Sequence, residues 1–171
     1  MTQPPLPENE TARVEALRRY AILDTLPEQI YDDVTALASL IFGTPIALVS
    51  LVDADRQWFK SEVGLGKRET PRSESFCAHT LETAASLIVR DASQDPRFRD
   101  HPAVVGDPKI RFYAGAPLVE PDGHVLGTVC VIDTSPRTPT VIQVAALEAL
   151  ARQVMALLEC RRNGKLPEGT K

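Results

Sequence analysis

Residues 110–133 read IRFYAGAPLVEPDGHVLGTVCVID, and this stretch decides the fold of the chain. Two apolar runs, 110–118 and 125–133, flank the tetrapeptide EPDG at 120–123. Proline, aspartate and glycine each suit their position in a tight turn. The sequence therefore predicts two strands joined in a hairpin.

A further hairpin is predicted upstream. Residues 45–52 (PIALVSLV) form a continuous apolar run that is too short for a good helix and is typical of a strand buried on both faces. Residues 53–55 (DAD) favour a turn. The half-polar run 56–63 (RQWFKSEV) then predicts an edge strand that is antiparallel to the first.

The region between the hairpins predicts only short elements. Residues 64–72 are expected to be a loop, residues 73–83 a short helix, and residues 87–89 (LIV) a short strand. A small helix is expected to open at 93–96, with Asp95 as its cap and Pro96 at its first position.

Three longer stretches have apolar residues at helical spacing. The first covers residues 10–23. The second starts at the capping-box pattern TLPE (25–28) and ends at Gly43. The third starts at Thr138 and meets no helix breaker until Gly164, so it could run for about 24 residues or some 36 Å.

The C-terminal helix carries two apolar stripes. One set follows coiled-coil spacing and forms a seam: Val144, Leu147, Ala151, Val154 and Leu158. The other set is Ile142, Leu150 and Leu157. One stripe can cover the sheet, and an exposed second stripe is uncommon in monomers. We therefore expect a parallel homodimer through this helix, with the first helix contributing, unless the first helix covers the seam within one chain.

Composition predicts one globular domain in the cytoplasm. The 171 residues carry a net charge of −4 and are 43% hydrophobic, which is enough for a buried core. No apolar run approaches the roughly 18 residues of a membrane span, and the N-terminus lacks a signal-peptide pattern. Basic residues are interleaved with acidic ones, so we expect neither a nucleic acid nor a membrane as a partner. Residues 1–9 and 163–171 are expected to be flexible ends of a domain at 10–162.

Three cysteines, Cys77, Cys130 and Cys160, are widely spaced and are expected to be reduced thiols. Cys130 lies in a predicted central strand, where it is expected to act as a small buried hydrophobic residue. No phosphate loop, zinc-ligand spacing or serine–histidine–aspartate pattern is found. The sequence therefore identifies no metal site, no cofactor and no catalytic residue.

Four segments together resemble the GAF domain, the small-molecule sensory module of bacterial signalling proteins and of cyclic-nucleotide phosphodiesterases. They are 13–33 (RVEALRRYAILDTLPEQIYDD), 75–81 (SFCAHTL), 112–118 (FYAGAPL) and 126–133 (LGTVCVID). They resemble the branch found at the N-terminus of bacterial sensor histidine kinases and diguanylate cyclases. The resemblance implies an α+β fold with a central antiparallel sheet in strand order 2-1-5-4-3. It also implies terminal helices packed on one face and a ligand pocket on the other.

The resemblance further implies which side chains meet a ligand. In similar domains the pocket is walled by the segments that here carry Phe76, Cys77, His79, Phe98, Arg111 and Tyr113. Arg111 and Tyr113 alternate with Phe112 along one strand and so share a face. An arginine there would suit an anionic ligand, although an exposed salt bridge is an equal alternative.

The expected function is a non-enzymatic sensory or regulatory module. It would bind a small molecule, or relay a signal through a helical dimer, and act on an output domain or a partner kinase or cyclase. A bilin-binding photosensor is one alternative, because CAH (77–79) resembles the Cys-His pair of those proteins, in which the two residues are adjacent. A free methionine-(R)-sulfoxide reductase is another, but no resolving cysteine occurs elsewhere between residues 64 and 117. A third is a ligand-free GAF domain that only dimerises its host protein.

Overall fold

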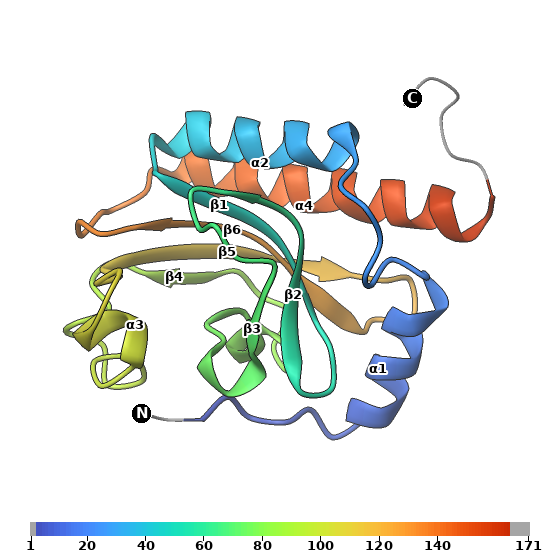
Figure 1. Cartoon of the computed structure of the whole chain (residues 1–171), viewed down its shortest axis with the longest axis horizontal. Helices are drawn as coiled ribbons and strands as arrows, with labels where there is room; N and C mark the ends of the chain where they lie inside the picture. Colours follow the sequence, from blue (N-terminus) through green and yellow to red (C-terminus); the bar gives the residue numbers. More distant parts are fainter. Residues whose placement is uncertain (1–2, 165–171) are drawn as a thin grey trace.

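One antiparallel sheet forms the centre of the molecule. In the computed structural model, which describes residues 3–164, its strands lie in the order β3-β2-β1-β6-β5-β4 (Figure 1). The strands are β1 (Ile46–Val52), β2 (Arg56–Val63), β3 (Glu69–Pro71), β4 (Leu87–Val89), β5 (Phe112–Val119) and β6 (Val125–Asp133). The five strands expected from the sequence are all present in the implied order. The short strand β3, which lies in the expected loop 64–72, adds a sixth beside β2.

The helices lie on both sides of this sheet. They are α1 (Glu10–Arg19), α2 (Gln29–Phe42), α3 (Pro102–Val105) and α4 (Val141–Arg162), with two 3₁₀ turns, η1 (Arg72–Glu74) and η2 (Cys77–Thr80). Figure 1 shows α2 and α4 side by side along one face, and α3 on the opposite side. The fold is therefore α+β, with its long helices on one face only.

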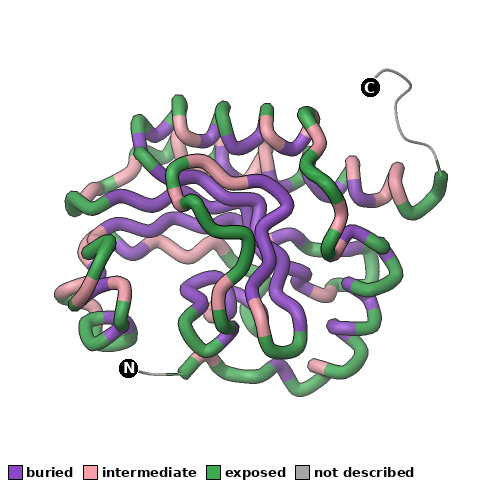
Figure 2. Tube along the Cα trace, in the orientation of Figure 1, coloured by how far each residue is buried: buried purple, intermediate pink, exposed green. Residues whose placement is uncertain are grey.

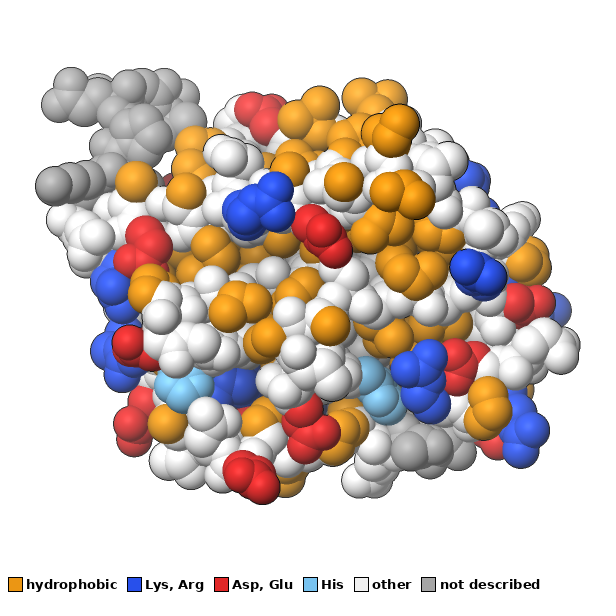
Figure 3. All heavy atoms as spheres, turned by 180° about the vertical axis from the view of Figure 1, so that it is seen from behind, with side chains coloured by type: hydrophobic (Ala, Val, Ile, Leu, Met, Phe, Trp, Pro, Cys, Tyr) orange, Lys and Arg blue, Asp and Glu red, His pale blue; other side chains and the backbone are white. Residues whose placement is uncertain are grey.

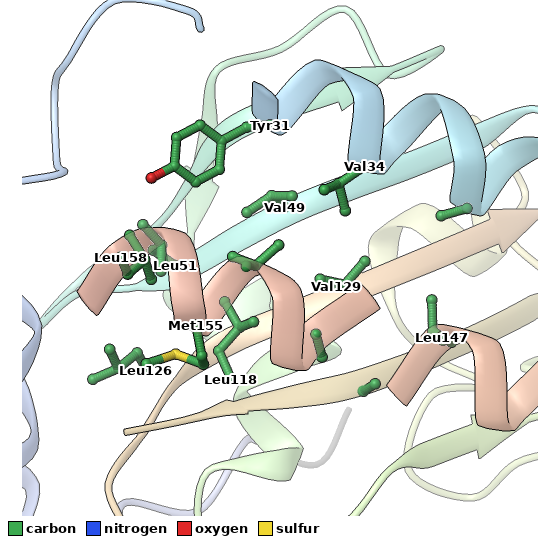
Figure 4. Packing of buried hydrophobic residues seen from close by; sticks show 14 of the residues in the cluster. Tyr31, Val34, Val49, Leu51, Leu118, Leu126, Val129, Leu147, Met155 and Leu158 are labelled. Carbon is green, nitrogen blue, oxygen red and sulfur yellow. The ribbon is translucent and has the colours of Figure 1, made fainter. Parts of the chain in front are cut away.

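The sheet is buried on both faces. Every residue of β1 and β6 is buried, as the purple strands of Figure 2 show. On one face Val49 and Leu51 of β1 and Val129 of β6 pack against α2 and α4 (Figure 4). On the other face Leu48 and Cys130 pack against η2 and the segment around α3. This second face carries the candidate site.

The expected apolar seam on α4 is not exposed. Four of its five residues, Leu147, Ala151, Val154 and Leu158, are each at most 2% exposed and pack in the core between α4 and the sheet. The fifth, Val144, is half-buried. A helix that lies on a sheet buries residues at spacings of three and four, just as a coiled coil does. The prediction of an exposed seam is therefore wrong, and neither a second chain nor α1 is needed to cover this stripe.

Among the described helices, α4 alone is long and apolar enough, by length and composition, to cross a membrane. A helix in the core of a globular domain passes the same test. Here the apolar stripe of α4 is accounted for by its packing on the sheet.

The linker before α2 is held by a buried lysine, which explains why the expected capping box is absent. Lys60 of β2 is fully buried, and its Nζ lies 2.5 Å from a carboxylate oxygen of Glu28. The same Nζ donates to Thr25 Oγ1 at 2.9 Å and to the Leu26 carbonyl at 2.6 Å. The Thr25 oxygen accepts from Lys60 and its hydroxyl donates to the Ile22 carbonyl, so Thr25 does not cap the helix, and α2 begins only at Gln29.

Other boundaries differ from the expected ones for local reasons. Helix α1 ends at Arg19 rather than near residue 23. Residues 73–83 form 3₁₀ turns instead of one helix, and Asp95 caps a turn through the Arg97 amide without starting a helix. The short helix α3 was not expected. The end of α2 at Gly43, in the left-handed region with φ of 63°, matches the expectation.

Of the expected flexible ends, residues 3–9 form no helix or strand. The tail at 163–171 lies almost entirely outside the described residues.

Helix α4 begins at Val141, three residues after the expected start. Thr140 and Gln143 cap it reciprocally in a capping box.

An arginine pair ties α1 to the hairpin of β1 and β2. Arg13 is 1% exposed, and it donates to the carbonyl of Val52 at 2.8 Å and to Glu10 at 2.8 Å. Arg72 also contacts Glu10 and donates to the Asp53 carbonyl at 2.9 Å. Burial on its own raises the pKa of Glu10, but the two guanidinium groups outweigh it and lower this pKa to about 2.

We predict that Glu10→Gln lowers the free energy of unfolding at neutral pH by about 1–2 kcal/mol, allowing for solvent screening. A depressed carboxyl pKa stabilises the fold above the ordinary value of 4.5, and this contribution is lost as pH falls toward 2. The gap between wild type and variant in urea unfolding should therefore close over that range. Glu15→Gln, an exposed position on the same helix, is the control. A gap that does not change with pH would contradict the ion-pair explanation.

Candidate functional site

A cavity of about 280 Å³ lies on the face of the sheet opposite α2 and α4. Its floor is formed by side chains of four strands: Leu48, Gln57, Phe59, Tyr113 and Ile132. Its walls come from the β2–β3 connection, η1, η2 and the segment around α3. The sheet therefore supplies a rigid floor, and loops and single turns supply the walls.

Three of the six predicted site residues line this cavity. They are Phe76, Cys77 and Tyr113, and all three are buried. Phe76 and Tyr113 lie with their ring centroids 5.3 Å apart. Strand β5 and turn η2 therefore both bring predicted residues to this cavity.

The other three predicted residues do not line the cavity. Phe98 stacks behind Phe76, with ring centroids 4.2 Å apart, and His79 packs edge-on against Phe98 at 4.8 Å. Burial, with a smaller effect of Arg97, lowers the pKa of His79 to about 4, so this histidine is neutral at pH 7. The guanidinium of Arg111 is bound to the carbonyls of Val104 and Ile110 at 3.0 and 2.9 Å, so it braces the wall.

The Cys77 thiol is the meeting point of several hydrogen bonds. Its sulfur accepts from Thr128 Oγ1 at 3.0 Å, from the Tyr113 hydroxyl at 3.1 Å and from Gln57 Nε2 at 3.5 Å. The sulfur of Cys130 lies 3.9 Å away, in hydrogen-bond contact with it. The sequence did not anticipate this contact, because the two cysteines are 53 positions apart.

A glycine makes room for one of these donors. The Tyr113 side chain runs along β5 over Gly115, where an added β-carbon would come within 2.2 Å of the tyrosine hydroxyl oxygen. Any larger residue at 115 would push this hydroxyl away from Cys77. The donor geometry around the thiol is therefore built into the backbone of β5.

The pKa values of the two thiols are shifted in opposite directions. Burial favours a neutral Cys77, but the hydrogen bonds from Cys130, Thr128 and Tyr113 outweigh it and lower the pKa of Cys77 below the usual thiol range. Burial and the neighbouring Cys77 raise the pKa of Cys130 well above that range. One sulfur is thus prepared to carry a negative charge, and the other keeps its proton.

Sequence reasoning missed several polar lining residues. They are Gln57, Lys67, Thr70, Glu74, His101 and Asp107. The His101 Nδ1 accepts from the Ala103 amide at 3.0 Å, so its Nε2 carries the proton and donates to the Glu74 carbonyl at 2.8 Å. A histidine followed by Pro102 at the first helical position was the available sequence signal for this cap.

A larger groove of about 790 Å³ lies elsewhere, between β4 and the start of α4. It is open to solvent and contains none of the predicted site residues. Within residues 3–164, no group of three or more His, Cys, Asp or Glu side chains is placed to hold a metal ion. The smaller cavity, with its buried polar groups, is therefore the better candidate site.

Comparisons with known proteins agree with this architecture. The cyclic di-GMP phosphodiesterase PA2567 of Pseudomonas aeruginosa is 45% identical over 164 residues, which cover 95% of this chain but only 28% of that protein. The chain therefore spans less than a third of that relative's length.

Two solved structures share the fold. The GAF domain of a phosphoenolpyruvate-protein phosphotransferase from Coxiella burnetii is 18% identical with a TM-score of 0.66, over 93% of this chain and 100% of that one. The PixJ GAF domain of Thermosynechococcus elongatus, in its blue-light absorbing form, is 18% identical with a TM-score of 0.62, over 85% and 87%. At these identities the likeness concerns the fold alone.

The family model for the GAF domain matches residues 26–158. That range extends from the linker before α2 to the last turns of α4 and includes the whole sheet and the cavity. This chain belongs to the GAF domain family.

Proposed function

We propose that this chain is a sensory module of bacterial signal transduction that binds a small molecule in the cavity beside Cys77. The cavity carries the proposal: the sheet and short turns bound it, and three predicted ligand-binding residues line it. Pockets for small molecules are concave, largely apolar and equipped with a few placed polar groups. Phe76, Cys77 and Tyr113 would contact the ligand, and His79, Phe98 and Arg111 would hold the wall.

The lining suggests the chemistry of the ligand. Phe59, Phe76 and Ile132 offer an apolar surface, and Gln57 and Glu74 offer a donor and an acceptor. A volume of about 280 Å³ is at the small end for ligand pockets. We therefore propose a compact molecule with an apolar body and polar groups on one side.

The signal would pass through the sheet to α4 and then to an output domain or a partner. Cys130 and Ile132 of β6 face the cavity side, whereas Val129 and Val131 of the same strand pack in the core below α4. A shift of β6 would therefore change the packing of α4 on the sheet. The relative from P. aeruginosa supports an output in cyclic di-nucleotide signalling, and a kinase or cyclase partner fits the same scheme. We place this activity in the cytoplasm.

The alternatives have less support. The likeness to PixJ concerns the fold alone, and His79 does not line the cavity, so a bilin site is not favoured. A reductase is not favoured because the relative that is 45% identical is a signalling protein. The expected lack of a resolving cysteine no longer counts against a reductase, since Cys130 lies 3.9 Å from Cys77. A ligand-free GAF domain stays open to the test described next.

We predict that a cavity-filling substitution removes ligand binding. Protein purified without additions should release a small molecule that mass spectrometry detects, or gain thermal stability with a member of a metabolite panel. Ala103→Phe, which places a ring at a cavity-lining position, should abolish either signal because it occupies the ligand's volume. Ala36→Phe on the outside of α2 is the control. A wild-type protein with neither signal would favour the ligand-free GAF domain.

We further propose a homodimer, on a surface different from the α4 seam. The outer helical surface consists of Leu37, Leu40, Ile41, Val141 and Ile142, which are 38–87% exposed. The Gln143 side chain donates to the Ile41 carbonyl at 3.1 Å, so the end of α2 and the start of α4 are adjacent. Figure 3 shows hydrophobic side chains gathered along the upper rim of the molecule, where these helices lie.

We predict that Leu40→Glu converts the dimer to a monomer in sedimentation equilibrium, because a charge would be buried in the interface. Leu26→Glu changes an equally exposed leucine outside this surface and should leave the dimer intact. A monomeric wild-type protein, or a dimer that tolerates both charges, would rule this surface out.

A further inference from the structure

Two cysteine thiols from distant parts of the chain meet beside the cavity. Cys77 lies on η2 and Cys130 on the central strand β6, and their sulfur atoms are 3.9 Å apart. A disulfide requires about 2.0 Å between the sulfurs. Cys77 is on a single 3₁₀ turn rather than in a regular helix or strand, so the gap can close by a movement of this turn.

Their surroundings differ in a way that assigns each thiol a role. Thr128, Tyr113 and Gln57 aim donors at the Cys77 sulfur, and the Cys130 sulfur lies 3.9 Å from the same atom. A neutral thiol has one hydrogen and a weakly accepting sulfur, and it does not need three donors. A thiolate does, and the thiolate is the nucleophilic form of cysteine.

The cavity gives access to one thiol only. The lining includes Cys77 but not Cys130, which is fully buried between strands. A small reagent that enters the cavity therefore meets Cys77 first. The Cys130 thiol lies behind Cys77 and contacts its sulfur.

We propose that Cys77 and Cys130 form a dithiol site that hydroperoxides oxidise to a reversible disulfide. The Cys77 thiolate attacks the peroxide O–O bond, takes one oxygen and becomes a sulfenic acid, while the other oxygen leaves as hydroxide or alkoxide and is protonated. Cys130 then loses its proton, its sulfur bonds to that of Cys77, and the sulfenic oxygen leaves as water. Two thiols are oxidised, and one hydroperoxide is reduced to water and an alcohol, or to two waters.

Oxidation would alter the cavity. The new bond draws η2 toward β6 and displaces the Cys77 sulfur, which contacts Gln57 and Tyr113 of the cavity lining. The same site thus connects the redox state of the chain to the shape of its binding cavity. The chemistry of the thiol pair itself requires no ligand, so it stands apart from the ligand-binding proposal.

Peptide mapping after oxidation tests the proposal. The full-length protein is treated with stoichiometric hydrogen peroxide, alkylated under denaturing conditions and digested with trypsin. We expect a linkage between peptides 73–90 and 112–137, which dithiothreitol reverses, in wild type and in Cys160→Ser. Cys160 lies on α4, and its removal leaves only the proposed pair. Oxidation confined to Cys160, or Cys77 sulfinic acid without any linkage, would overturn the proposal.

Variants separate the two steps. Cys130→Ser should stop at a sulfenic acid on Cys77 that dimedone traps, and Cys130→Ala serves the same purpose if the serine disturbs folding, which circular dichroism reports. Tyr113→Phe should slow oxidation roughly threefold to tenfold, because it removes a donor to the thiolate. The matched control is Tyr31→Phe, since the buried Tyr31 hydroxyl has no hydrogen-bond partner in the described part of the chain. Equal rates for both tyrosine variants would contradict the proposed role of the donor set.

Discussion

The burial of β1 and β6 on both faces is the constraint on which this structure depends. Every side chain of both strands is buried, so each face of the sheet must be covered along its centre. Two long helices cover one face with regular ridges of side chains. The other face is covered by 3₁₀ turns, a four-residue helix and loops. Such irregular cover leaves space that regular helices would fill, and the cavity is that space.

The same constraint explains which parts of the fold could be predicted from sequence. A strand buried on both faces is a continuous apolar run, so residues 45–52 and 125–133 are readily recognised. The end of α2 at Gly43 is equally easy to predict, because only glycine adopts the left-handed conformation there without strain. Helix α4 was located correctly, but the surface against which its apolar seam packs was not. Apolar residues three and four positions apart fit a sheet as well as a second helix.

The elements that sequence did not reveal are those fixed by distant contacts. The 3₁₀ turn η2 has no apolar periodicity, and its place depends on hydrogen bonds such as that from the Ala78 amide to Ser75 Oγ. The capping box expected at 25–28 is lost because Lys60, from another element, engages Thr25. Likewise Phe76, Cys77 and Tyr113 were found by resemblance, but the contact of Cys77 with Cys130 depends on where η2 docks on the sheet.

The register of β6 connects the thiol pair on the cavity face to the packing of α4. Cys130 pairs with Gly115 on β5 and with Leu48 on β1, so its thiol lies on the cavity face between the two neighbouring strands. Its neighbours in sequence, Val129 and Val131, point to the opposite face because side chains alternate along a strand. They belong to the core that holds α4. A change at the Cys130 sulfur is therefore one peptide unit away from the packing of the long helix. Within one strand, the chemistry of the cavity face and the position of α4 share the same backbone.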